Sequence, residues 1–188
     1  MRFEIDEKNG LPRIQTDAYH ILAQGKFTSN RLRLHIQGKR KSYPPELRES
    51  IEQAWSLAQE EAEKNGQMIY NEKLFSLMQY QIREGTLNLL LGETDYKELL
   101  GTNFSIPERK VPCDEKLLSD GVAICSTIIT EDAFLMVGRR SRQVLRGVGK
   151  LHVCAGHPVT DRVLTLDGML KGENFFFSEM KREIMEEF

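Results

Sequence analysis

Three glutamates close together near the C-terminus can act as one chemical group. Glu183, Glu186 and Glu187 are spaced i, i+3 and i+4, so on a helix their carboxylates share one face. Like charges this close repel one another, and an oxygen-only set of ligands suits Mg²⁺, or Mn²⁺, better than zinc. Arg182 can hydrogen-bond one of the carboxylates and orient it. The pattern predicts a metal site that activates water and neutralises phosphate oxygens.

The same segment has a simpler interpretation as a solvated helix face. Lys181 and Arg182 stand among the acids and can form salt bridges with them. An isolated E-x-x-E-E pattern favours this interpretation, because so short a pattern arises often by chance. The choice therefore depends on the elements around the pattern.

The glutamates lie on a predicted helix from about Ser178 to the end of the chain. Its apolar residues recur every three or four positions and predict a buried stripe: Phe177, Met180, Ile184 and Phe188. Upstream, three short apolar or alternating runs, 122–129, 134–138 and 151–154, predict strands of a second sheet.

The first part of the chain predicts a smaller α+β region. Residues 31–37 alternate as a half-buried strand that closes at Gly38, and residues 74–82 and 86–91 form a hairpin. A helix begins at Pro44-Pro45 and stops at Asn65-Gly66. Its predicted buried positions are Leu47, Ile51, Trp55, Ala58 and Ala62.

A short helix over residues 95–100 is predicted next, with Thr94 as its N-cap and Gly101 at its end. The stretch 105–113 contains Pro107 and Pro112 and has the composition of a linker. We therefore divide the chain into a region 1–114 and a region 115–188.

Composition sets broad limits on partners and compartment. The 188 residues are 40% apolar and 29% charged with a net charge of -2, which is typical of a soluble globular protein and indicates neither a nucleic-acid nor a membrane partner. No apolar run is long enough to span a membrane. Cys113, Cys125 and Cys154 lack a C-x-x-C spacing, which predicts reduced thiols and a cytoplasmic protein, with Cys125 and Cys154 in the core.

The segment R-E-I-M-E-E-F resembles the second half of the Nudix hydrolase signature, G-x5-E-x7-R-E-U-x-E-E-x-G-U, where U is a bulky aliphatic residue. The resemblance implies that Glu183, Glu186 and Glu187 bind metal and carry the base, with Arg182 beside them. The turn A-G-H-P at residues 155–158 stands where the family has a strand-end P-G-G turn.

The first half of the signature departs from the family pattern. Residues 157–173, seventeen in place of five, separate Gly156 from the position eight before Arg182. That position is Asn174 where the family has glutamate, and Glu173 lies one residue out of register. The sequence leaves open whether Glu173 replaces the missing glutamate.

Residues 94–104, residues 138–144 and the A-G-H-P turn are similar to the eukaryotic Nudix proteins that hydrolyse UDP-glucose and UDP-galactose. The resemblance implies six substrate contacts: Arg139, Arg140, Arg142, His157, Thr102 and Asn103. Simpler interpretations stay open, namely a helix C-cap and turn, a charged strand edge and a histidine that caps its loop. We expect residues 94–104 to lie beside the substrate cleft, with Thr102 or Asn103 turned towards the Nudix sheet.

Together these observations predict an α/β (α+β) fold in which a Nudix-type mixed sheet and its catalytic helix follow the smaller α+β region. The implied reaction is Mg²⁺-dependent hydrolysis of a UDP-sugar to UMP and a sugar 1-phosphate. The alternatives are a non-catalytic nucleotide-binding module and a Nudix hydrolase of ADP-ribose or a dinucleoside polyphosphate.

The sequence stops at Phe188, before the glycine of the signature. We therefore expect a fragment of a longer protein, or a fold that a dimer mate or another chain completes. Such a chain should have little hydrolase activity alone and should expose apolar surface around Ile184 and Phe188.

Overall fold

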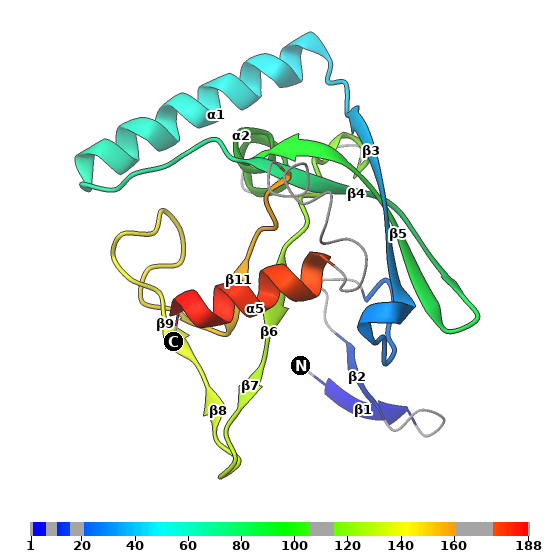
Figure 1. Cartoon of the computed structure of the whole chain (residues 1–188). Helices are drawn as coiled ribbons and strands as arrows, with labels where there is room; N and C mark the ends of the chain where they lie inside the picture. The colour runs from blue at the N-terminus through cyan, green and yellow to red at the C-terminus, as the bar shows by residue number, and fades with distance from the viewer. Residues whose placement is uncertain (1, 7–10, 16–20, 106–114, 161–174, 188) are drawn as a thin grey trace.

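The computed structural model describes residues 2–6, 11–15, 21–105, 115–160 and 175–187, and the side chains of 21–105, 116–160 and 175–186. Within these residues the architecture is mixed α+β, as the sequence predicts (Figure 1). Helix α1 crosses the top of the view, a mixed sheet descends on the right, and helix α5 lies below α1. No helix in the described part of the chain is both long and apolar enough to cross a bilayer.

The main sheet has the strand order β3-β5-β4. Strand β3 (Leu32–Arg40) runs parallel to β5 (Thr86–Asp95), and β4 (Lys73–Arg83) pairs antiparallel with β5, which confirms the predicted hairpin. Gly38 does not end β3 as predicted. It lies inside the strand, where the register shifts between Ile36 and Arg40. Ahead of this sheet, β1 (Arg2–Asp6) and β2 (Leu11–Gln15) pair antiparallel, and a 3-10 turn, η1 (Ser29–Arg31), leads into β3.

Helix α1 spans Pro45–Lys64, as the proline and Asn-Gly signals predict. Gly66 follows with a positive φ of 63°, which suits a glycine after a helix end. The buried face consists of Ile51, Ala54, Ala58 and Ala62. Trp55 is half-buried and meets the ring of Tyr96 edge-on at 6.3 Å between centroids.

The short helix after β5 begins and ends at residues other than those predicted from the sequence. Asp95 caps α2 (Tyr96–Leu99), because its carboxylate accepts the Glu98 N–H at 2.9 Å, so Thr94 is not the cap. The chain then continues past Gly101 as a π-helix, η2 (Leu100–Phe104), where the prediction ended the helix. Gly101 serves close packing here, since an added Cβ would lie 2.7 Å from Cγ1 of Ile51 in α1.

The C-terminal region begins with a 3-10 turn, η3 (Glu115–Leu117), and continues in short strands. These strands are β6 (Ile124–Ser126), β7 (Ile128–Ile129), β8 (Leu135–Met136), β9 (Gly138–Arg139), β10 (Leu151–His152) and β11 (Cys154–Gly156). Strands lie where the apolar runs predicted them, but they form three separate antiparallel pairs, β6–β11, β7–β8 and β9–β10, in place of one second sheet. Cys154 is buried as predicted, whereas Cys125 points to the exposed side of β6.

Strand β4 joins the two regions. Ser76 forms an isolated bridge with Gly121, Leu74 forms another with Val159, and the Val122 N–H donates to the Phe75 carbonyl at 2.8 Å. The side chains of the joint core come from both regions: Phe75, Leu91, Phe175 and Phe176.

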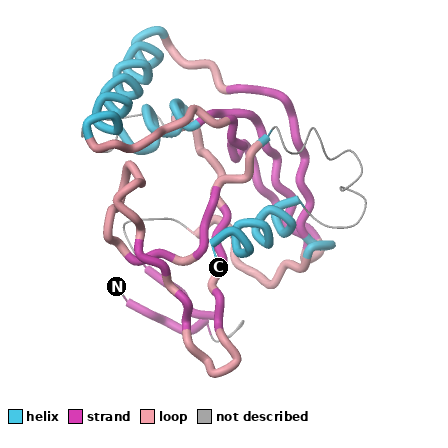
Figure 2. Tube along the Cα trace, turned by 60° about the vertical axis from the view of Figure 1, so that its left-hand side comes forward, coloured by secondary structure: helices cyan, strands magenta, loops and turns pink. Residues whose placement is uncertain are grey.

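Helix α5 (Phe175–Glu187) begins three residues earlier than predicted and packs against β6 and β11 (Figure 2). Its buried residues are Phe175, Phe176 and Glu179, so the predicted stripe is wrong at Phe177, which is 37% exposed. The rings of Phe175 and Phe176 both pack edge-on against the ring of Phe75, which explains why these two residues are buried in place of Phe177. Ile184 is half-buried, and Phe188 lies outside the described residues.

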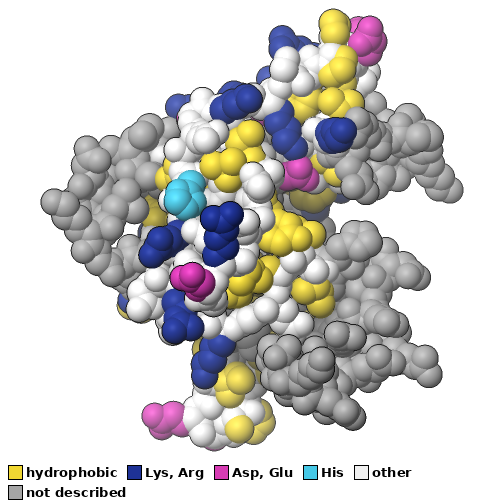
Figure 3. All heavy atoms as spheres, turned by 90° about the vertical axis from the view of Figure 1, so that its right-hand side faces the viewer, with side chains coloured by type: hydrophobic (Ala, Val, Ile, Leu, Met, Phe, Trp, Pro, Cys, Tyr) yellow, Lys and Arg dark blue, Asp and Glu magenta, His cyan; other side chains and the backbone are white. Residues whose placement is uncertain are grey.

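The side of the molecule where β3 and β5 run carries lysine and arginine side chains mixed with apolar ones (Figure 3). Partly exposed apolar residues of this sheet include Ile36, Tyr80 and Ile82. Ile36 pairs with Leu91 and Tyr80 pairs with Leu89, so these side chains lie on the same face of the sheet as the core.

Candidate metal and catalytic site

Arg182 gathers three carboxylates of helix α5 around its guanidinium. Its Nη1 donates to Oε2 of Glu186, and its Nη2 donates to Oε1 of Glu183 and to Oε2 of Glu179, the last at 3.3 Å. Burial alone would lower the pKa of Arg182, but the hydrogen bonds to Glu186 and Glu179 raise it. The guanidinium therefore stays charged throughout the neutral range and keeps the carboxylates together.

Glu179 is the member of this cluster that the sequence analysis missed. Its side chain is 7% exposed, against 18% for Glu183 and 60% for Glu186. The signal was present in the spacing, since Glu179, Arg182, Glu183 and Glu186 follow the i, i+3, i+4, i+7 pattern of one helix face.

The carboxylate of Glu183 lies against the backbone at the end of β11. A Cβ added to Gly156 would lie 2.6 Å from Cδ of Glu183 and 2.8 Å from both carboxylate oxygens. Only a glycine leaves this space, so the strand-end turn and the acidic helix face meet at Glu183. This contact connects the A-G-H-P turn with R-E-I-M-E-E, the two segments that carry most of the signature.

Three further positions of the predicted site have side chains outside the described set. Glu187 lies in α5, but its side chain is outside the described set, and both Glu173 and Asn174 are outside it entirely. Within the described residues, no three His, Cys, Asp or Glu side chains are grouped as a metal-binding cluster.

His157 follows Gly156 and braces the turn. Its Nδ1 lies 2.9 Å from the Val122 carbonyl, and since a carbonyl only accepts, Nδ1 carries the proton. The imidazole thus links the turn to the segment that leads into β6.

Two of the predicted substrate arginines hold the loop between β9 and β10. Arg139 donates from Nη1 to the Gly149 carbonyl, and Arg140 donates from Nε to the Arg146 carbonyl, both at 3.0 Å. Arg142 has an exposed side chain, and its carbonyl accepts from the Gln67 amide at 2.7 Å. These contacts give the loop a defined shape.

Thr102 and Asn103 are turned towards the segment before β6. The Thr102 hydroxyl accepts the Ser119 N–H at 3.0 Å, and the Asn103 side-chain oxygen accepts the Asp120 N–H at 3.1 Å. Thr102 is completely buried and also donates to the Glu98 carbonyl at 2.7 Å. In the described structure both side chains therefore anchor η2 to the C-terminal region.

Comparison with known proteins adds evidence of relationship. The chain is 35% identical over 83 residues to uridine diphosphate glucose pyrophosphatase NUDT22 of Mus musculus, a match that covers 40% of this chain and 27% of that protein. The protein of the same name from Homo sapiens is 36% identical over 80 residues, covering 38% of this chain and 26% of that protein. The chain thus matches about a quarter of the length of these relatives. No model of a known protein family matches the chain.

The resemblance to the Nudix hydrolases is confirmed. Nudix hydrolases generally use divalent metals, and the glutamates around Arg182 carry the oxygen atoms that such ions prefer, whereas the described side chains by themselves do not form a group of three metal ligands. The carboxylate of Glu183 occupies the space that the missing side chain of Gly156 leaves. Arg182 engages one oxygen of Glu183 and one oxygen of Glu186.

Proposed function

We propose that this chain carries the catalytic helix of a Mg²⁺-dependent Nudix pyrophosphohydrolase that cleaves a UDP-sugar to UMP and a sugar 1-phosphate. The observation that supports it best is the contact of Glu183 with Gly156, because it places an acidic helix face at a strand-end turn. The names of the two relatives support uridine diphosphate glucose as the substrate class.

In this proposal Glu183, Glu186 and Glu187 hold the metal, and Arg182 orients two of them. A bound Mg²⁺ would supply charge neutralisation at the phosphates and lower the pKa of water. Oxygen from water forms a new bond to one phosphorus of the diphosphate, and the bridging P–O bond breaks. One phosphate leaves with the uridine and the other with the sugar.

The test, made on the full-length protein, is release of UMP from UDP-glucose in Mg²⁺, followed as inorganic phosphate with a coupled phosphatase. We expect Glu186→Gln and Glu187→Gln to lower turnover by orders of magnitude with little change in thermal stability, because in this proposal each substitution removes a metal ligand. Glu131→Gln, at an exposed position in the turn between β7 and β8, is the matched control. Wild-type turnover in Glu187→Gln would remove that residue from the site.

A second function, nucleotide binding without hydrolysis, is favoured by Asn174 at the position of a signature glutamate. The same assay separates the two functions. Binding of UDP-glucose without metal-dependent release of UMP would support the binding module and overturn the hydrolase.

A further inference from the structure

One side of the C-terminal strands is apolar and exposed in the described structure. Exposure alternates along β6 and β7, where Ile128 is half-buried and the next residue is exposed, and it alternates again from Leu135 to Arg139. The exposed apolar members of this pattern, together with the phenylalanine of the turn between β7 and β8, form what we call the outer face. Their side chains are 46–68% exposed: Ile129, Phe134, Leu135, Val137 and Leu151.

The strand pairings place the strand residues of the outer face on the same side. Ile129 pairs with Leu135, and Leu151 pairs with Arg139. Leu135, Val137 and Arg139 are two residues apart, and alternate residues of a strand point to the same side. Directly paired residues of antiparallel strands also share a side. The apolar side chains are therefore neighbours on one surface.

Helix α5 packs on the opposite side of these strands (Figure 1). Ile124 of β6 packs against the core that contains Phe175 and Phe176, and its strand partner Gly156 faces Glu183. An antiparallel sheet that is covered on one side commonly presents polar residues on the other. The outer face is apolar instead, which is the pattern of a sheet that packs against a second layer.

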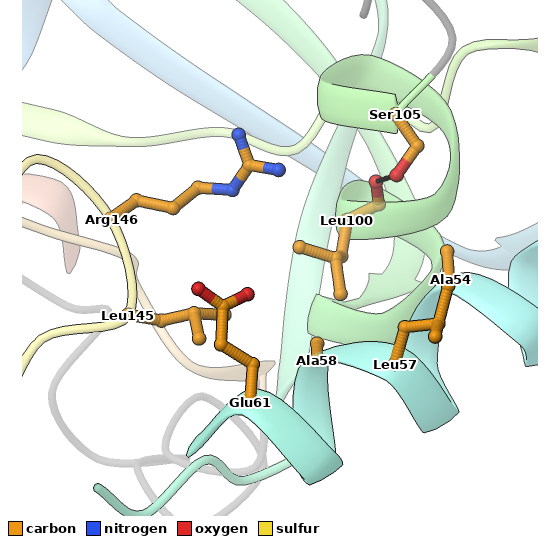
Figure 4. A pocket seen from close by; sticks show the side chains of 8 residues that line it. All are labelled: Ala54, Leu57, Ala58, Glu61, Leu100, Ser105, Leu145 and Arg146. Carbon is orange, nitrogen blue, oxygen red and sulfur yellow. Dashed lines mark hydrogen bonds between the residues drawn. The ribbon is translucent and has the colours of Figure 1, made fainter. Parts of the chain in front are cut away.

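The loop that joins β9 and β10 is engaged with other elements. Leu145 and Arg146 line a pocket of about 460 Å³ together with residues of α1 and η2 (Figure 4). The Gln67 amide donates to the carbonyls of Arg142 and Val144 at 2.7 and 3.1 Å. The loop is therefore held beside α1, and the exposure of the outer face shows that no described element covers it.

Charges of opposite sign mark the two ends of the outer face. Asp132 lies in the turn of the β7–β8 hairpin, where its carboxylate accepts the hydroxyl of Thr130. Arg139 lies at the other end and donates from Nη1 to the Gly149 carbonyl, so most of its five N–H donors remain for a partner. The hairpin projects at the bottom of Figure 1, and Figure 3 shows acidic and apolar side chains together at this tip.

We propose that the outer face binds the outer face of a second copy of this chain, in a two-fold dimer whose strands run antiparallel. A two-fold interface brings one surface onto itself, so an apolar face is its own complement. Antiparallel strands set the tip of one copy over the base of the other, and Asp132 then meets Arg139 of the second copy. A parallel arrangement would set Asp132 against Asp132. The acidic tip also disfavours the negatively charged surface of a membrane.

The experiment is sedimentation equilibrium of the full chain at concentrations from about 1 to 200 µM. We expect a reversible dimer with a dissociation constant on the order of 1–100 µM, because five side chains cover only part of the roughly 800 Å² per partner of a standard interface. Leu135→Glu should raise this constant at least about 10-fold, since a two-fold dimer buries the new charge twice. Leu57→Glu, at a similarly exposed leucine of α1, is the matched control and should leave it unchanged.

Two charge substitutions test the antiparallel arrangement. Asp132→Arg and Arg139→Asp should each weaken the dimer several-fold, and the effect should shrink at high salt. The double variant should regain the wild-type dissociation constant, because the pair forms again with its charges exchanged. An effect of Arg139→Asp on its own loop would not be reversed by a change at Asp132, so this rescue separates contact from structural damage.

Three results would overturn the proposal. They are a wild-type protein that stays monomeric up to about 200 µM, a dimer that Leu135→Glu leaves intact, and a dimer that Asp132→Arg strengthens. The first of these would assign the outer face to a different partner. Circular dichroism and the melting temperature check that Leu135→Glu is folded, and Leu151→Glu makes the same test from β10 if it is not.

This proposal does not rest on the proposed hydrolase function, because α5 lies on the opposite side of the strands. Sedimentation measures association without metal or substrate. Failure of the dimer therefore leaves the hydrolase proposal standing, and absence of hydrolysis leaves the dimer standing.

Discussion

Gly156 and Gly101 both lie where a methyl group would contact another element, and the atoms they face differ. Beside Gly156 is the carboxylate of Glu183, the far end of a flexible side chain. Beside Gly101 are Cα and Cγ1 of Ile51, which belong to the backbone and inner side chain of a packed helix. A side-chain end can rotate away, whereas a helix backbone cannot move without repacking. The same substitution should therefore disturb activity at one position and stability at the other.

We expect Gly156→Ala to abolish most hydrolysis at a small cost in stability. The new Cβ would lie 2.6 Å from Cδ of Glu183, so the carboxylate must leave the turn. Metal-dependent turnover and the unfolding midpoint in urea measure the two effects.

The control for this prediction is to make Gly156→Ala in a protein that already carries Glu183→Gln. If Gly156→Ala acts through Glu183, adding it to Glu183→Gln should cause little further loss of turnover, because the two changes remove the same group. Fully additive losses would contradict the contact as the cause.

Helix α1 depends on Gly101 for its close approach to η2. We expect Gly101→Ala to lower the free energy of unfolding by about 1–3 kcal/mol, as overpacking does in a filled interior. Chemical denaturation measures this change. Ser56→Ala, at an exposed position of α1, should change stability by less than about 0.5 kcal/mol. Equal effects of the two substitutions would show that the helices do not meet here as described.

A second feature of these elements is the buried phenol of Tyr43, just before α1. Burial raises the pKa of Tyr43, and the nearby Glu98 carboxylate raises it further. As pH increases, the unfolded chain loses this proton first, from a value near 10.0. The contribution to stability is therefore complete below pH 10 and is lost as pH rises above it.

We expect Tyr43→Phe to make the loss of stability above pH 10 shallower than in the wild type. The slope from one such tyrosine is at most about 1.4 kcal/mol per pH unit. Unfolding free energies from pH 8 to pH 11 test this prediction. Tyr70→Phe, at a side chain that is 63% exposed, is the control and should keep the wild-type slope.

Among the described residues of the whole molecule, the regions before and after residue 114 share a hydrophobic core. The ring of Phe75 in β4 lies 6.0 Å from that of Phe175 and 6.1 Å from that of Phe176, measured between centroids. Backbone bridges from β4 to Gly121 and Val159 strengthen this join. The division into regions 1–114 and 115–188 therefore remains a prediction from the sequence. Unfolding experiments can test whether the two regions are independent domains.

We expect Phe75→Ala to cost about 3–5 kcal/mol and to destabilise both regions together. Thermal unfolding should show one transition, detected equally by far-ultraviolet circular dichroism and by fluorescence of Trp55. Leu57→Ala, at a position 62% exposed, should have a small effect. Two separate transitions, only one of them shifted by Phe75→Ala, would instead support two independent domains.

Local patterns in the sequence were enough to predict several elements of this protein. Periodicity and end signals predicted α1, the β4–β5 hairpin and the helix that carries Glu183 and Glu186, because each depends on residues a few positions apart. The same spacing placed these carboxylates on one face with Arg182. The A-G-H-P turn and the R-E-I-M-E-E segment indicated a resemblance to the Nudix hydrolases, and the partial matches to two such proteins support it.

Contacts between distant segments decided the rest. Packing on Phe75 determines that α5 buries Phe175 and Phe176 in place of Phe177. Loop geometry assigns Arg139 and Arg140 to backbone carbonyls and brings Arg146, which the sequence did not single out, into a pocket. These outcomes depend on which surfaces meet in space, and short-range periodicity carries no information about such partners.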